Sequence, residues 1–125
     1  MERAPDGVTA TAHWYQFASL TAKFAKMLKR ESEAREFESL AAKIRAAFVA
    51  KYVKDGVVAN GTQSAQAIAL YLGLVPPEQV PAAEAALVRA VDAAGCAPTT
   101  GIFVALGGEE RIAHRPCAYK GVTGI

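Results

Sequence analysis

The chain has 125 residues, enough for one domain with one hydrophobic core. Hydrophobic residues make up 52% and charged residues 21%, and because much of the apolar share is alanine, the composition favours helices around a thin core. The formal net charge is +2, and Lys and Arg alternate with Glu instead of forming one stripe, which argues against a nucleic-acid partner. No stretch reaches the roughly 18 apolar residues that cross a bilayer, so we expect no membrane partner and a cytoplasmic location. Two separated cysteines and two histidines outline neither a disulfide framework nor a metal site, and we expect no metal and no cofactor.

Apolar residues recur at three- and four-residue steps in the first half of the chain and predict two long helices. The first runs from Thr9 to about Arg30 and the second from about Ser32 to Val53. Because the break between them is short, we expect an antiparallel hairpin. The predicted packing faces are Phe17, Leu20, Phe24, Met27 and Leu28 of the first helix and Phe37, Leu40, Ala41, Ile44 and Phe48 of the second.

Two further helices follow a segment of turns. Residues 54–61 contain Asp-Gly and Asn-Gly around three small apolar residues, which indicates turn, short extended piece and turn. The third helix is predicted to start near Thr62 and to stop at Gly73, with two prolines just beyond it. The fourth is predicted over about 78–94, with Pro81 in its first turn, where proline is tolerated.

The end of the chain lacks a period. Pro98-Thr99-Thr100-Gly101 is a loop signal ahead of what looks like the start of a fifth helix, and residues 107–125 hold four glycines and a proline without helical or alternating pattern. The sequence thus predicts an all-α domain of antiparallel helical hairpins over residues 1–106 and an irregular tail over 107–125. Repeated helix pairs are typical of an α/α toroid or an α-solenoid.

Four segments resemble one enzyme family. Residues 61–76, with Thr-Gln at the helix start and Gly-Leu-Val-Pro after its end, resemble a signature of bacterial α-L-rhamnosidase catalytic domains of glycoside hydrolase family 78. Residues 99–103 are similar to the Thr-Thr-Gly segment that opens the next inner helix of that family. Residues 9–15 resemble the start of an earlier inner helix and 41–48 the end of an outer one, so the likeness covers about Val8 to Phe103.

The resemblance implies part of a six-hairpin (α/α)6 barrel with the first, third and fifth helices on its inner ring. Their starts would then lie at the end of the toroid that holds the sugar. Helix N-termini present unpaired N–H groups and a partial positive charge. The candidate substrate-binding residues are therefore Thr62, Gln63, Thr99, Thr100 and His13, although any helix start carries such capping residues for structural reasons alone.

The resemblance also implies that the chain has no catalytic residue of its own. The family uses a general acid upstream of this region and a general base downstream of it, and inversion requires both. Glu109 and Glu110 are neighbours on the tail and do not face each other across a cleft. We therefore expect a fragment of an inverting hydrolase that removes terminal α-L-rhamnose, inactive alone. We expect residues from Ala105 onward to have no counterpart in the family, and a frameshift or a truncated reading frame would explain this.

Two other interpretations of the sequence stay open. One is a helical scaffold or interaction module without catalysis, and the other is a fragment of a different six-hairpin glycosidase. Ala67, Leu70 and Tyr71 make the third helix apolar nearly all round, so we expect an uncovered apolar surface there and self-association through it.

Overall fold

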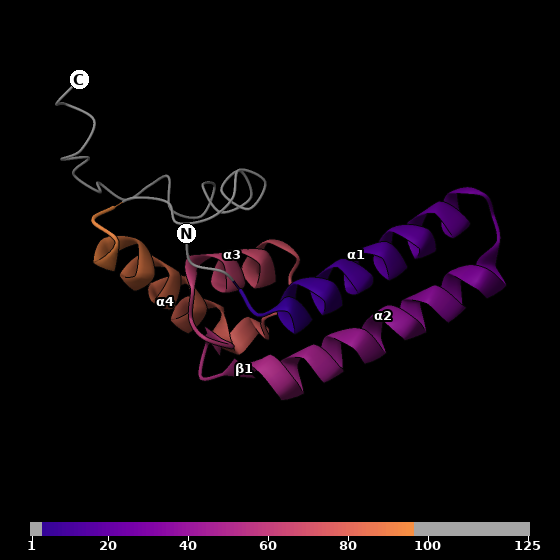
Figure 1. Cartoon of the computed structure of the whole chain (residues 1–125). Coiled ribbons are helices and arrows are strands. Elements are labelled where there is room, and N and C mark those ends of the chain that lie inside the picture. The colour runs from indigo at the N-terminus through magenta and orange to yellow at the C-terminus, as the bar shows by residue number, and fades with distance from the viewer. Residues whose placement is uncertain (1–3, 97–125) are drawn as a thin grey trace, which may run out of the picture.

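The computed structural model describes residues 4–96, and in that range the chain is all-α apart from one short β-hairpin (Figure 1). The elements are α1 (Asp6–Met27), α2 (Glu31–Tyr52), β1 (Val53–Lys54), β2 (Val57–Val58), α3 (Gln63–Tyr71), a 3-10 turn η1 (Pro77–Gln79) and α4 (Val80–Ala93). This confirms the predicted fold class. No helix within residues 4–96 combines the length and the apolar character that crossing a bilayer requires.

Helices α1 and α2 form the predicted antiparallel hairpin, which extends away from the rest of the molecule as a two-helix arm (Figure 1). The link between them is a Schellman turn in which Lys29 takes a positive φ of 58°. The amide of Arg30 donates to the Ala25 carbonyl at 2.8 Å, and the amide of Lys29 donates to the Lys26 carbonyl at 3.0 Å. Three residues therefore suffice to reverse the chain.

The predicted packing face of α1 is wrong. The buried residues of α1 are all small, namely Val8, Ala12, Ala18, Ala22 and Ala25. The bulky residues Phe17, Phe24 and Met27 are 67%, 59% and 76% exposed. Alanine lets two helices approach closely, and the bulky stripe on another side of α1 then faces away from α2. The prediction for α2 is right in its second half, because Ala41, Ile44 and Phe48 are buried.

The β-hairpin connects the arm to the second helix pair. Val53 pairs with Val58 and Lys54 with Val57 in an antiparallel register. The two residues of the turn, Asp55 and Gly56, have φ of 51° and 81°, and two positive φ values are what a type I′ hairpin turn requires. The predicted turn and short extended piece are thus confirmed, and they pair into a ladder.

Helices α3 and α4 pack on each other and on the root of the arm. Their core consists of Ala65, Ala67, Ala69, Leu70, Leu74, Ala83, Leu87 and Val91, joined by Val8, Ala12 and Phe48 from the arm. Phe48 thus lies near the N-terminal half of α1. The expected uncovered surface on α3 is wrong for Ala67 and Leu70, which are buried against the core, whereas Tyr71 is exposed.

Candidate functional site

The N-terminus of α3 is the first candidate site. Thr62 is the N-cap of α3, and its hydroxyl oxygen accepts a hydrogen bond from the Ala65 amide at 3.4 Å. The same hydroxyl donates to Oδ1 of Asn60 at 3.0 Å. A hydroxyl has one proton and two lone pairs, so Thr62 keeps acceptor capacity beyond these bonds. The side chain is only half-buried, and its role in sugar binding stays a prediction.

Gln63 has a different environment. Its side chain is 3% exposed, and its amide nitrogen donates to the Ala90 carbonyl of α4 at 3.3 Å. In this conformation the residue ties α3 to α4. A sugar contact through Gln63 stays a prediction, and it would require the side chain to adopt a different rotamer.

His13 lies on the exposed surface of α1, where Nδ1 is 2.8 Å from the Thr9 carbonyl oxygen one turn earlier. This local bond leaves the ring on the surface, and its role as a sugar contact stays a prediction. Its neighbours divide as expected for successive helix positions, since Tyr15 packs on the core and Trp14 is 56% exposed. Thr99, Thr100, Glu109 and Glu110 lie outside the described residues.

A buried glutamine, which no sequence pattern indicated, organises the second helix pair. Gln66 is fully buried, and its Oε1 accepts a hydrogen bond from the Val58 amide of β2. Its Nε2 donates to the Gly56 carbonyl at 3.0 Å and to the Ala83 carbonyl of α4 at 3.1 Å. Three polar groups of the side chain are thus matched to three backbone groups. Gln66 is a structural clamp whose bonds leave no amide hydrogen for a sugar.

Gly56 is the residue that this clamp holds in place. A Cβ on Gly56 would come within 2.6 Å of the Ala82 side chain and 2.8 Å of backbone atoms of α4, and the amide of Gly56 donates to Oε1 of Gln79 at 3.0 Å. Glycine is therefore required at this position for two reasons, the positive φ and the close approach to α4. The Asp-Gly pair in the sequence indicated the turn but not its contact with α4.

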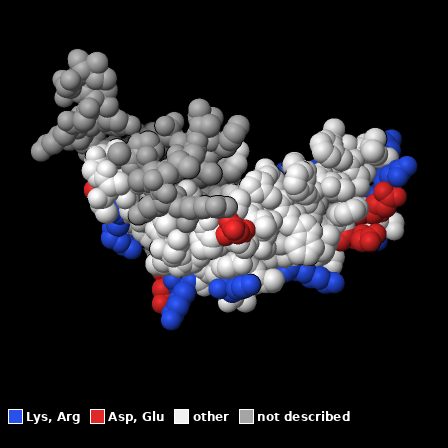
Figure 2. All heavy atoms as spheres, viewed as in Figure 1, with Lys and Arg blue, Asp and Glu red and all other residues white. Residues whose placement is uncertain are grey.

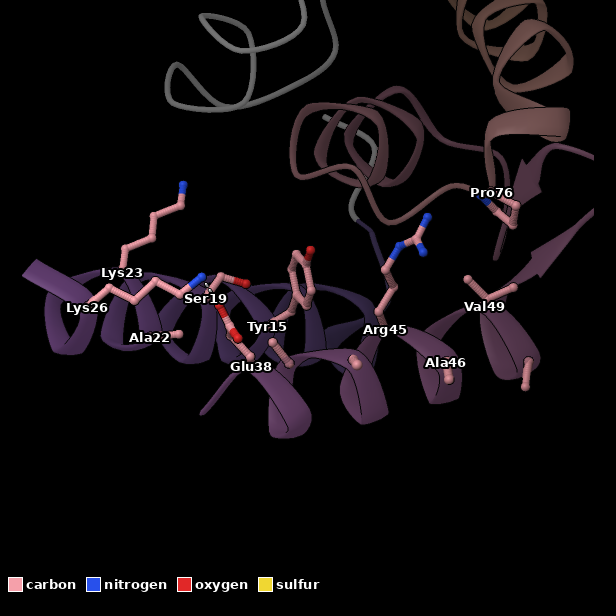
Figure 3. Close-up of a pocket in the computed structure, with 13 residues that line it drawn as sticks. Tyr15, Ser19, Ala22, Lys23, Lys26, Glu38, Arg45, Ala46, Val49 and Pro76 are labelled. Atoms are coloured by element: carbon pink, nitrogen blue, oxygen red, sulfur yellow. Dashed lines mark ion pairs between the residues drawn. The ribbon is translucent and has the colours of Figure 1, made fainter. Parts of the chain in front are cut away.

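A groove of about 760 Å³ runs along the arm between α1 and α2 (Figure 3). Its small residues are Ala22, Ala41, Ala42, Ala46 and Ala50. Lys26 forms an ion pair with Glu38 across the groove. Arg45 of α2 donates from Nε to the Gly73 carbonyl at 3.0 Å and from Nη2 to the Val75 carbonyl at 3.5 Å, which ties the arm to the loop after α3. The cations of the groove thus have intramolecular partners, apart from Lys23, which extends outward.

None of the Asp and Glu side chains of residues 4–96 is buried. Glu38 is the single carboxylate among the groove-lining residues of the described chain, and the buried polar side chains of residues 4–96 are Gln63 and Gln66. An acid and a base for glycoside hydrolysis must face each other across the scissile bond, with an apolar environment around the acid. Among the same residues no three His, Cys, Asp or Glu side chains gather closely enough to hold a metal ion.

The arrangement of helix pairs matches known glycosidases. The crystal structure of native α-L-rhamnosidase from Aspergillus terreus aligns with a TM-score of 0.75 and 24% sequence identity, over 82% of this chain and 12% of that chain. This likeness shows the fold of a six-hairpin glycosidase domain.

The sequence comparisons are more specific than the fold. Residues 1–113 match the family described as the bacterial alpha-L-rhamnosidase 6 hairpin glycosidase domain. An alpha-L-rhamnosidase of Streptomyces avermitilis is 36% identical over 103 residues, which are 82% of this chain and 10% of the relative. The chain belongs to the bacterial α-L-rhamnosidase six-hairpin glycosidase family, and it spans about a tenth of the length of the relative that it matches.

Proposed function

We propose that this chain forms helical hairpins of the catalytic barrel of a glycoside hydrolase that removes terminal α-L-rhamnose with inversion, and that residues outside the chain supply the general acid and the general base. The match of residues 1–113 to the six-hairpin rhamnosidase family carries the proposal. The second part is supported by the groove, because Glu38 is the single carboxylate among its described lining residues, whereas inversion needs two facing carboxyl groups about 6.5–9.5 Å apart.

In this proposal the chain positions and contacts the sugar. The first turn of α3 offers N–H groups and a partial positive charge, and the Thr62 hydroxyl beside them can accept a hydrogen bond from a sugar hydroxyl. His13, Gln63, Thr99 and Thr100 are the other proposed contacts. Gln66, Gly56 and Arg45 hold the β-hairpin and the α3–α4 pair against the arm and thereby fix where α3 begins.

A chimera tests the proposal. The 103-residue segment of the Streptomyces avermitilis relative is replaced by the matching residues of this chain, and release of nitrophenol from an aryl α-L-rhamnoside is measured. We expect the chimera to turn over the substrate, with β-rhamnose as the first product by NMR, and the 125-residue chain alone to show no turnover.

Two results would contradict the proposal. One is a folded chimera, with the circular dichroism of the parent, that does not hydrolyse the rhamnoside. The other is turnover by the 125-residue chain that is lost in its own Glu38→Gln variant.

A further inference from the structure

The loop between β2 and α3 differs in character from the exposed surface of the arm. Trp14, Phe17 and Phe24 lie on an apolar side of α1 that is nearly free of charge in Figure 2 and suits packing against neighbouring helices of a six-hairpin domain. The loop, residues 59–62, holds no bulky apolar side chain. Asn60 in this loop is exposed, is the single asparagine of the 125 residues and is followed by a glycine.

Asn60 and Gly61 are arranged for a reaction within the chain. A Cβ at Gly61 would meet one atom, Cγ1 of Val57, at 3.4 Å, so the space beside the Gly61 amide nitrogen is open. This nitrogen and the side-chain carbonyl carbon (Cγ) of Asn60 belong to adjacent residues, and their proximity replaces an encounter in solution. The Gly61 amide donates to the Val58 carbonyl at 2.9 Å, a single loop bond that local opening breaks.

Thr62 holds the carbonyl that the Gly61 nitrogen would attack. Its hydroxyl donates to Oδ1 of Asn60 at 3.0 Å, and its amide donates to the same oxygen at 3.4 Å. Negative charge develops on this oxygen when a nucleophile adds to the carbon. Donors that are already in place stabilise this charge without having to reorient, so Thr62 favours the reaction.

We propose that Asn60 is a site of self-modification. The Gly61 nitrogen bonds to Cγ of Asn60, the bond from Cγ to Nδ2 breaks, and the amide group leaves with the Gly61 proton as ammonia. The resulting cyclic imide takes up water and opens to aspartate or, where water adds to the main-chain carbonyl, to isoaspartate. Both products add a negative charge before α3, and isoaspartate also lengthens the main chain by one atom. The inference does not depend on the proposed hydrolytic function.

The fold protects the two Asp-Gly pairs of the chain, which form the same imide by loss of water. Gly56, after Asp55, is buried, and a Cβ there would lie 2.6 Å from a side chain of α4. Gly7, after Asp6, lies in the first turn of α1 against the Tyr52 hydroxyl. An imide at either pair requires packed elements to separate. The modification is therefore directed to Asn60.

Ageing of the purified 125-residue chain tests the proposal. After incubation at mildly alkaline pH, peptides are analysed by mass spectrometry, and isoaspartate is detected independently by methylation with a protein isoaspartyl methyltransferase. We expect conversion and isoaspartate at Asn60 in the folded chain, and isoaspartate at Asp55 and Asp6 only in the chain unfolded by urea. An unchanged Asn60 in the folded chain, or equal isoaspartate at Asp55, would overturn the proposal.

Substitutions provide the matched comparison. Gly61→Ala shields the nitrogen and should slow the conversion of Asn60 about tenfold or more. Gly73→Ala places a methyl group on a second glycine with the same positive φ, 69° against 70°, and should leave the rate unchanged. Thr62→Ala removes one donor to Oδ1 and should slow conversion about fivefold, whereas Thr62→Ser keeps the hydroxyl and should change it by less than about twofold. Equal slowing by Gly73→Ala, or faster conversion in Thr62→Ala, would contradict the proposed reaction geometry.

Discussion

The arm and the second helix pair are held together by different interactions. Helices α1 and α2 meet through alanines such as Ala18 and Ala41, and their ion pairs lie on the surface. The β-hairpin and the α3–α4 pair share one fully buried polar side chain, Gln66, and a glycine that touches backbone. The arm therefore depends on the size of small residues, whereas the second region depends on a few directional bonds. Substitutions that add volume should damage the first, and substitutions that remove a polar group should damage the second.

The largest effect is expected for Gln66→Leu. The variant keeps most of the volume but leaves the Val58 amide and the carbonyls of Gly56 and Ala83 without their partner in a buried site. Each unsatisfied buried group costs about 1–3 kcal/mol, so we expect a loss of about 4 kcal/mol in the free energy of unfolding. Urea unfolding followed by circular dichroism at fixed chain concentration measures it. A loss below about 1 kcal/mol would mean that water or a backbone shift replaces the clamp.

Gln66 also shows what could be predicted from the sequence. The helices, the hairpin of α1 and α2, the Asp-Gly turn and the Thr62 cap follow from local patterns of a few residues. Gln66 and Arg45 bond to backbone groups up to 17 and 30 positions away, and nothing in the local sequence distinguishes them from solvated helix residues. The same holds for the candidate site. The sequence predicted the cap of α3, which is a local feature, but not the direction of the Gln63 side chain, because that direction depends on where α4 lies.

The wrong prediction of the packing face of α1 has a related physical cause. Periodicity gives the apolar sides of a helix but not which of them a given neighbour covers. Phe17 and Phe24 are the more hydrophobic choice, yet Ala18, Ala22 and Ala25 form the side that allows close approach to α2. The sequence therefore shows both the bulky apolar side and the alanine side of α1, and only the packing with α2 determines which of them is buried.

The second largest effect is expected for Ala18→Leu in the arm. Ala18 is 4% exposed, packs with Ala41 and Ile44 and does not line the groove, so three added carbons must push α1 and α2 apart. Overpacking of this kind costs about 1–3 kcal/mol, although leucine is a good helix former. The control is Ala47→Leu on the exposed face of α2, which should change the free energy of unfolding by less than about 0.5 kcal/mol. If both variants behave alike, the alanine interface does not limit the approach of the helices.

A smaller effect is expected for Thr62→Ala at the start of α3. The substitution removes the acceptor for the Ala65 amide and the donor to Asn60, and loss of an N-cap costs about 1 kcal/mol. Thr62→Asp keeps a capping oxygen and should recover most of that stability. In the chimera with the Streptomyces relative, a sugar contact would lower kcat/KM in Thr62→Asp as well, whereas a purely structural cap would lower it only in Thr62→Ala. The pair of variants thus separates the two roles that the sequence left open.

The smallest effect is expected for Glu38→Gln, which removes the ion pair between α1 and α2. The side chains of Lys26 and Glu38 are 61% and 46% exposed, so solvent and salt screen their attraction. Exposed pairs contribute about 0.2–1 kcal/mol, and we expect a loss in the lower half of that range that disappears at about 1 M NaCl. Glu36→Gln removes the same charge from α2 outside this ion pair and corrects for the change in net charge. A loss from Glu38→Gln that equals the loss from Ala18→Leu and persists in salt would show that the arm, like the second helix pair, depends on a directional bond.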